Sequence, residues 1–199
     1  MTALADIDLV LASASPYRRA LLGRITPRFR VLPGRVDETA SPSESPARLA
    51  ARLALAKTHA VAAACINTVI VGSDQVAELD GCALGKPGTP DNARAQLDMC
   101  SGREVLFHTA LCLLDTRGSS PCAYAAMDTT RVLFRTLDTA EIARYVEREQ
   151  PLDCAGSFKC EALGIALFER IETDDPTALV GLPLIALCRL LREAGIDPV

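Results

Sequence analysis

Three hydroxyl-proline pairs constrain how this chain can fold, because each one precedes a run of residues with helical character. The pairs are Ser15-Pro16, Ser45-Pro46 and Thr89-Pro90. Serine and threonine cap helices because their side-chain oxygen accepts a backbone N–H, and proline fits the first helical position, where no donor is needed. The pattern predicts helices over residues 16–22, 46–64 and 90–100.

Apolar segments of strand length alternate with these helices. Residues 7–12 and 68–73 are typical of buried strands, and Asp80-Gly81 predicts a hairpin turn after the second. Residues 104–114 and 122–134 predict two long paired strands.

The C-terminal third continues the alternation. Asp138 and Glu141 have the spacing of a capping box for a helix that ends at Glu149. A last strand over 164–171 and a terminal helix over 183–194 follow. No repeat or flexible linker interrupts the chain. We therefore predict a single α/β domain over residues 1–199, a mixed sheet with flanking helices that bends into two lobes around a cleft.

Charge and composition exclude several classes of function. The net charge of −4 argues against broad nucleic-acid binding, which needs a basic face. No apolar run of membrane-spanning length or signal peptide is evident, so we expect no membrane partner. The eight cysteines lack CxxC or metal-finger spacing, and we interpret them as small core residues of a cytoplasmic protein.

Lysine is rare in this sequence. Only Lys57, Lys86 and Lys159 accompany eighteen arginines. Lysine is a compact, flexible point charge that suits a phosphate oxygen, so the retained lysines are candidates for anion binding. Chance in an arginine-rich chain is the alternative.

The junction between the first strand and the first helix is a second candidate anion site. Ser13, Ser15 and Arg18 lie where free backbone N–H groups and the helix dipole favour a phosphate. The alternative is that Ser15 only caps the helix and the arginine is solvated. No glycine-rich nucleotide loop of the Rossmann or P-loop type is present.

Two carboxylates are candidates for metal binding and catalysis. Asp74 follows an apolar strand, and we expect it at the carboxyl edge of the sheet, where α/β proteins keep their ligand sites. Glu38 lies in the loop before the long helix. Together they could hold Mg²⁺ and activate a water, although Glu38 alone could equally be a loop carboxylate.

Seven motifs, in order along nearly the whole chain, resemble the Maf family of nucleoside triphosphate pyrophosphatases. They are Ser13-Ala14-Ser15-Pro16-Tyr17-Arg18-Arg19-Ala20-Leu21-Leu22, Val36-Asp37-Glu38, Leu55-Ala56-Lys57, Gly72-Ser73-Asp74-Gln75-Val76, Leu84-Gly85-Lys86-Pro87, Ala155-Gly156-Ser157-Phe158 and Val180-Gly181-Leu182-Pro183-Leu184. The resemblance implies a Maf/inosine-triphosphate-pyrophosphatase-like fold, a divalent cation such as Mg²⁺ or Mn²⁺, cleavage between the α and β phosphates, and a homodimer.

The resemblance also implies roles for individual residues. Asp74 corresponds to the proton acceptor and Glu38 to a metal or water partner. Ser13, Arg18, Lys57 and Lys86 correspond to phosphate-binding residues.

Departures from the commonest family pattern resemble the branch that acts on 7-methyl-GTP. The residues concerned are Tyr17, Gln75 and Glu161. Methylation at N7 leaves guanine cationic, which suits an aromatic face such as Tyr17, and Glu161 could accept hydrogen bonds from the guanine N1 and N2 edge. A dTTP or UTP pyrophosphatase and a nucleotide-binding regulator of cell division are the alternatives. We expect no catalytic role for His59 or His108.

Overall fold

A mixed sheet runs the length of the molecule in a computed structural model that describes all 199 residues. The strand order is β3-β2-β4-β6-β7-β8, with β5 also paired to β4. These strands are β2 (Leu9–Leu11), β3 (Arg30–Val31), β4 (Val69–Leu79), β5 (Cys82–Leu84), β6 (Glu104–Asp115), β7 (Cys122–Phe134) and β8 (Phe168–Glu172). β2 is parallel to β3 and β4, whereas β4, β6, β7 and β8 are antiparallel, so the predicted mixed sheet is confirmed.

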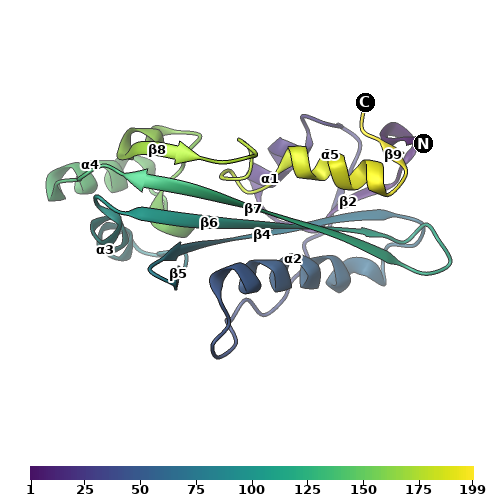
Figure 1. Cartoon of the computed structure of the whole chain (residues 1–199), viewed down its shortest axis with the longest axis horizontal. Helices are drawn as coiled ribbons and strands as arrows, with labels where there is room; N and C mark the ends of the chain where they lie inside the picture. The colour runs from purple at the N-terminus through teal and green to yellow at the C-terminus, as the bar shows by residue number, and fades with distance from the viewer.

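Helices cover both faces of this sheet (Figure 1). They are α1 (Pro16–Leu22), α2 (Pro46–Ala62), α3 (Pro90–Cys100), α4 (Thr139–Glu149) and α5 (Leu184–Glu193), with short 3-10 turns η1 (Leu4–Asp6), η2 (Ala155–Ser157) and η3 (Leu163–Leu167). α2 packs on one face, against β4 and β6, and α5 packs on the other, against β6 and β7. A small parallel sheet of β1 (Thr2–Ala3) and β9 (Ile196–Asp197) joins the two ends of the chain. No helix combines the length and apolarity needed to cross a bilayer.

Two main apolar cores lie at different ends of the long strands. One contains Phe107, Phe134 and Phe158 and is covered by α3 and α4. The other includes Leu11 from β2, Leu22 from α1 and Leu187 from α5. Because β4 and β6 supply residues to both cores, the two predicted lobes share one sheet.

The predicted helix starts are confirmed. In each case the hydroxyl of the cap residue accepts a hydrogen bond from the backbone N–H three residues on. The donor–acceptor distances are 3.3 Å for Arg18 to Ser15, 3.3 Å for Arg48 to Ser45 and 3.2 Å for Asn92 to Thr89. These caps satisfy backbone donors that the first helical turn leaves free.

Two turn predictions had different outcomes. The hairpin at Asp80-Gly81 is confirmed, and both residues have the positive φ that a tight two-residue turn requires. The capping box is only half formed. Asp138 Oδ1 accepts from the Glu141 backbone N–H at 2.7 Å, but the Glu141 carboxylate pairs with Arg135 instead of reaching back to the cap residue.

Two strand predictions were wrong in extent. The strand predicted over 68–73 continues as β4 to Leu79, because it pairs along this whole length with β6. The strand predicted over 164–171 begins only at Phe168. Its first half forms η3 because its backbone bonds locally and not to β7: the Ile165 N–H donates to the Ala162 carbonyl at 3.5 Å, next to a turn in which the Gly164 N–H donates to the Lys159 carbonyl at 3.1 Å.

The cysteine prediction was right for only part of the set. Cys65, Cys100 and Cys112 are buried, but Cys82 and Cys122 are exposed because they begin the strands β5 and β7 at the ends of turns. The other three, Cys154, Cys160 and Cys188, are partly buried, and all eight are free thiols.

Gly72 allows α2 to approach the sheet closely. A Cβ at this position would lie 2.6 Å from the Ala54 carbonyl oxygen and 2.6 Å from Thr58 Cγ2, both on α2. Neither α2 nor β4 can move away easily, because both are packed in buried cores. The absence of a side chain at Gly72 therefore sets the distance between α2 and β4.

Gly72→Ala should lower the free energy of unfolding by about 3 kcal/mol, since the added methyl overpacks a rigid contact. Urea denaturation measures this loss. Gly85→Ala is the matched control, because a Cβ there meets nothing within 4 Å, and it should change stability by less than about 0.5 kcal/mol. Equal stability of the two variants would contradict the proposed close approach.

Candidate active site

A pocket of about 590 Å³ opens between the two lobes. Its walls come from the β2–α1 junction, the loop before α2, α2 itself, β4, and the segments around residues 153–161 and 179–181. Every residue that the sequence singled out as a site candidate lines it: Ser13, Tyr17, Arg18, Glu38, Lys57, Asp74, Gln75, Lys86 and Glu161. The fold therefore places residues from distant motifs around one cavity, while their individual roles stay predictions.

Asp74 lies in the middle of β4, not at its end as expected. It nevertheless borders a strand end, because the neighbouring parallel strand β2 makes its last pairing between Leu11 and Val71. β2 stops there and the chain turns into α1, so no strand pairs with β4 beside Asp74 on this edge. Its carboxylate reaches the pocket although only 7% of the residue is exposed.

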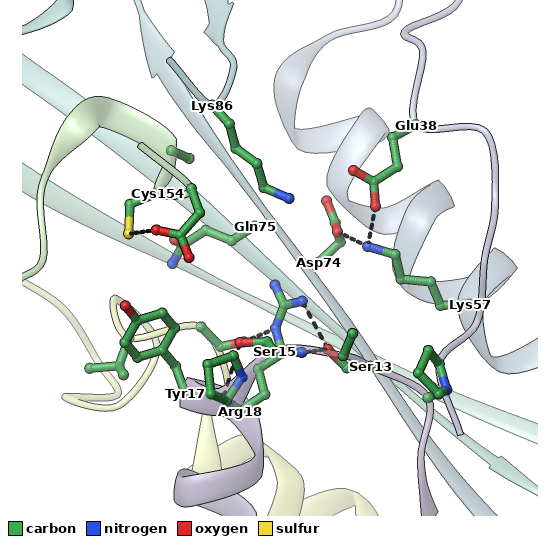
Figure 2. A pocket seen from close by; sticks show the side chains of 18 of the residues that line it. Ser13, Ser15, Tyr17, Arg18, Glu38, Lys57, Asp74, Gln75, Lys86 and Cys154 are labelled. Atoms are coloured by element: carbon green, nitrogen blue, oxygen red, sulfur yellow. Dashed lines mark hydrogen bonds and ion pairs between the residues drawn. The ribbon is translucent and has the colours of Figure 1, made fainter. Parts of the chain in front are cut away.

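The Lys57 ammonium lies between the two candidate carboxylates (Figure 2). Lys57 Nζ is 2.5 Å from Asp74 Oδ1 and 2.8 Å from Glu38 Oε1. The hydrogen bond from Lys57 is the main cause that lowers the pKa of Glu38, against a smaller opposing effect of burial. Because Lys57 is buried on α2, the pairing joins a helix, a strand and a loop at one point.

Gly34 brings the loop that carries Glu38 close to α2. A Cβ at Gly34 would lie 2.3 Å from the Lys57 carbonyl oxygen. Only glycine permits this approach without displacement of the loop. The contact between Glu38 and Lys57 therefore depends on a residue that the sequence analysis did not single out.

Arg18 extends from α1 into the centre of the pocket (Figure 2). Its Nε donates to the Gly181 carbonyl at 2.8 Å, and its Nη1 donates to Ser13 Oγ at 3.5 Å. Burial lowers the pKa of the guanidinium, while the carboxylates of Asp74 and Glu38 oppose that shift. These contacts fix the orientation of a cation that faces two anionic side chains.

Gly181 is a second contributor that the sequence analysis did not single out. Its carbonyl accepts from Arg18 and also from Ser73 Oγ at 2.9 Å. The φ of +121° at Gly181 favours glycine. The signal was present in the motif over residues 180–184, but the sequence does not show which side chain the carbonyl holds.

Lys86 is exposed at the mouth of the pocket, and its ammonium points inward (Figure 2). No carboxylate pairs with it, although its charge contributes to the lowered pKa of Glu38. Lys159, in contrast, does not line the pocket. Its Nζ donates to the Glu149 carbonyl at 2.8 Å and so satisfies the C-terminal end of α4.

The opposite end of the pocket is aromatic and acidic. Tyr17 lies on this side with Cys154 (Figure 2). Burial raises the pKa of the Tyr17 hydroxyl to about 12, with smaller contributions from Cys154, Asp153 and Glu161. Glu161 is exposed at the rim, where its Oε2 accepts from Cys160 Sγ at 3.4 Å.

The side-chain amide nitrogen of Gln75 forms hydrogen bonds within the wall of the pocket. Nε2 donates to Thr109 Oγ1 at 2.9 Å and to the carbonyls of Ala178 and Leu179 at 3.0 and 3.1 Å. These contacts tie β4 and β6 to the loop that ends at Gly181. The nitrogen is therefore already engaged, and direct base recognition by Gln75 stays a prediction.

The two histidines lie outside the pocket. His108 bonds to Glu78 Oε2 at 2.8 Å and to Thr129 Oγ1 at 3.1 Å, a cross-strand contact within the sheet. His59 is exposed on α2. No group of three or more His, Cys, Asp or Glu side chains is arranged to hold a metal ion.

Comparison with known proteins connects this pocket to one family. Residues 8–194 match the family described as Maf-like protein. A 7-methyl-GTP pyrophosphatase of Xanthomonas axonopodis pv. citri is 56% identical over 189 residues, which cover 95% of this chain and 97% of that protein. A 7-methyl-GTP pyrophosphatase of Albidiferax ferrireducens is 52% identical over 190 residues, 94% of each chain.

A solved structure supports the fold. The HAM1 protein of Coxiella burnetii aligns with a TM-score of 0.50 at 15% identity, over 94% of this chain and 99% of that one. The predicted Maf/inosine-triphosphate-pyrophosphatase-like fold class is confirmed.

Lys57→Met should raise the pKa of Glu38, because the variant loses the hydrogen bond and the charge that lower it. Carboxyl-carbon NMR titration measures this shift. A lowered pKa in the folded state stabilises the protein above the unfolded pKa, and this stabilisation disappears as the pH falls through the folded pKa. The variant should therefore lose part of the acid-sensitive stability.

Arg52→Met is the matched control. Arg52 is the main cause that lowers the pKa of Glu44 to about 2, and it does not contact Glu38. This variant should raise the pKa of Glu44 and leave that of Glu38 in place. An unchanged pKa of Glu38 in Lys57→Met would refute the ion pair.

Proposed function

Since the chain belongs to the Maf-like protein family, we propose that its pocket hydrolyses the α–β anhydride bond of 7-methyl-GTP to give 7-methyl-GMP and pyrophosphate. The observation that carries this proposal is the division of the pocket. Lys57 and Lys86, with Arg18 reaching into the centre, supply positive charge near Asp74 and Glu38 (Figure 2). Tyr17 supplies an aromatic ring on the other side, and the charge of the Glu161 carboxylate acts on it. Such a pocket complements a nucleotide with an anionic triphosphate and a cationic base.

At the cationic end, side chains are positioned to bind the triphosphate. Arg18 is held by Gly181 and Ser13, so its fork reaches phosphate oxygens without first losing much conformational freedom. Ser13 and the backbone at the start of α1 add hydrogen-bond donors. Lys86, free of any ion pair, approaches from the pocket mouth.

Asp74 is the general base of this reaction. Its Oδ1 pairs with Lys57, and its other oxygen is left to accept a proton from the attacking water. The water gives its proton to Asp74 as its oxygen bonds to one phosphorus atom of the α–β bridge. The bridging oxygen keeps the electron pair of the broken P–O bond and leaves on the other product, so that 7-methyl-GMP and pyrophosphate are formed. Lys57 and Arg18 balance the charge that develops.

A divalent cation, Mg²⁺ or Mn²⁺, is the proposed cofactor. Each of Asp74 and Glu38 uses one oxygen for Lys57. The second oxygen of Glu38 is therefore available to a cation, and the second oxygen of Asp74 would be shared between the cation site and the attacking water. Two protein carboxylates with substrate phosphates and water are a usual ligand set for Mg²⁺ in nucleotide sites. The residues present therefore fit the cation, which would neutralise triphosphate charge when bound.

We also propose that the protein is a homodimer of the cytoplasm. The eight free thiols suit a reducing compartment. A shallow groove between α2 and β7, with nine hydrophobic residues among its ten, is the apolar surface available to a second copy. Sedimentation of the purified protein measures the oligomeric state.

Asp74→Asn should reduce pyrophosphate release by about 100-fold or more while nucleotide binding survives, because the amide keeps the shape and loses the basic oxygen. Steady-state rates, with Mg²⁺ or Mn²⁺ titrated into chelator-treated protein, and calorimetric binding of 7-methyl-GTP measure both effects. Asp98→Asn, an exposed change on α3, is the control. Near-normal turnover in folded Asp74→Asn would remove Asp74 from the mechanism.

A substrate panel tests the base preference. The ratio of kcat/KM for 7-methyl-GTP to that for GTP should exceed one and fall in Tyr17→Ala, which loses a cation–π contact of ~0.5–2 kcal/mol. Tyr17→Phe keeps the ring and should keep most of the ratio. Glu161→Gln should lower selection by ~1–3 kcal/mol, because its amide offers one acceptor and an unwanted donor. Wild-type preference for dTTP or UTP would overturn the assignment.

A further inference from the structure

Two carboxylates at the base end of the pocket have no cationic partner. Asp153 and Glu161 both line the pocket beside Tyr17, and neither takes part in an ion pair. Asp153 Oδ1 accepts from Cys154 Sγ at 3.5 Å, and Glu161 accepts from Cys160 Sγ. Hydrogen bonds to thiols leave the charge of both carboxylates in place.

The thiols at this end are neutral. Burial raises the pKa of Cys154 to about 12, and burial likewise raises the pKa of Cys160 to about 12. Both side chains are therefore protonated at neutral pH and do not change the charge of the site. The base end thus carries two negative charges next to an aromatic ring.

No cation forms an ion pair with either carboxylate, although the charge of Lys159 acts on the neighbouring Cys154 thiol. Lys159 lies between Asp153 and Glu161 in sequence, but its Nζ is held by the Glu149 carbonyl and it does not line the pocket. Four cations do line it: Arg18, Lys57 and Lys86 lie around Asp74 and Glu38 (Figure 2), and Arg35 lies in the loop that carries Glu38. The pocket is therefore positively charged around Asp74 and Glu38 and negatively charged around Tyr17.

We propose that Asp153 is a specificity-determining residue that, with Glu161, makes the base end anionic and so selects nucleotides with positively charged bases as a class. This inference rests on the proposed function. 7-Methyl-GTP belongs to that class because N7 methylation fixes a positive charge on the ring. 1-Methyl-ATP, whose base is protonated at neutral pH, belongs to it as well and should be a further substrate.

Asp153 and Glu161 contribute to base selection in different ways. Glu161 can accept hydrogen bonds from the guanine edge, so its effect depends on which base is bound. Asp153 acts through charge alone, and its effect should be shared by all cationic bases. A charge held a few ångströms from the base, partly screened by water, changes affinity by about fivefold.

The test compares matched pairs of nucleotides that differ in base charge. The ratios of kcat/KM are measured for 7-methyl-GTP against GTP and for 1-methyl-ATP against ATP. Asp153→Asn should lower both ratios by about fivefold, and the double variant with Glu161→Gln should lower them further. Asp153→Glu, which keeps the charge, should retain them, and the distant surface change Asp98→Asn should leave them as in wild type.

The dependence of these ratios on salt concentration distinguishes an effect of charge from an effect on the shape of the pocket. In wild type both ratios should fall as ionic strength rises, because screening weakens the attraction, and this dependence should be weaker in Asp153→Asn. A residue that only supported the pocket wall would change rates without changing their salt dependence.

The outcomes distinguish this inference from the proposed function. A wild type that prefers 7-methyl-GTP, together with ratios unchanged in Asp153→Asn, refutes the role of Asp153 and leaves the pyrophosphatase intact. Calorimetric binding of 7-methyl-GMP against GMP gives the same comparison without turnover. If binding shows no preference for the methylated nucleotide in wild type, charge selection is refuted even if hydrolysis is observed.

Discussion

The ammonium of Lys57 holds the active pocket together, because it pairs at once with Asp74 on β4 and Glu38 in the loop before α2. Two like-charged carboxylates near one another would otherwise repel. The pairing also requires α2 to lie close to both partners. Gly72 permits the approach to the strand and Gly34 the approach to the loop, so two missing side chains are as necessary as the three charged ones.

Cationic and anionic side chains reach the pocket from different segments of the chain. The β2–α1 junction, α2 and the Lys86 loop supply cations, whereas residues 153–161 supply carboxylates and neutral thiols. Arg18 lies between these ends and is fixed by Gly181 and Ser13. In the proposed reaction, binding of a triphosphate is thereby separated from recognition of a base, and each would be altered by its own set of side chains.

Local sequence rules predicted most elements because their signals are local. A hydroxyl before proline fixes a helix start through one hydrogen bond, as at Ser15, Ser45 and Thr89. Predictions were wrong where a distant partner decided the outcome. β4 extends past Ser73 because β6 pairs with it, and Glu141 turns away from its cap to meet Arg135. The site candidates were found by type and motif, but their contacts with Gly181 or Lys57 could not be read from spacing.

The scatter of the motifs along the chain follows from this architecture. The pocket needs β2 to stop beside β4, so its residues come from the junction after Leu11 and from the middle of the neighbouring strand. It also needs the loop before α5, because Gly181 anchors Arg18 and Gln75 bonds to Ala178 and Leu179. Each motif supplies one wall and is weak evidence alone. Their order along the chain is informative because only the complete fold brings them together.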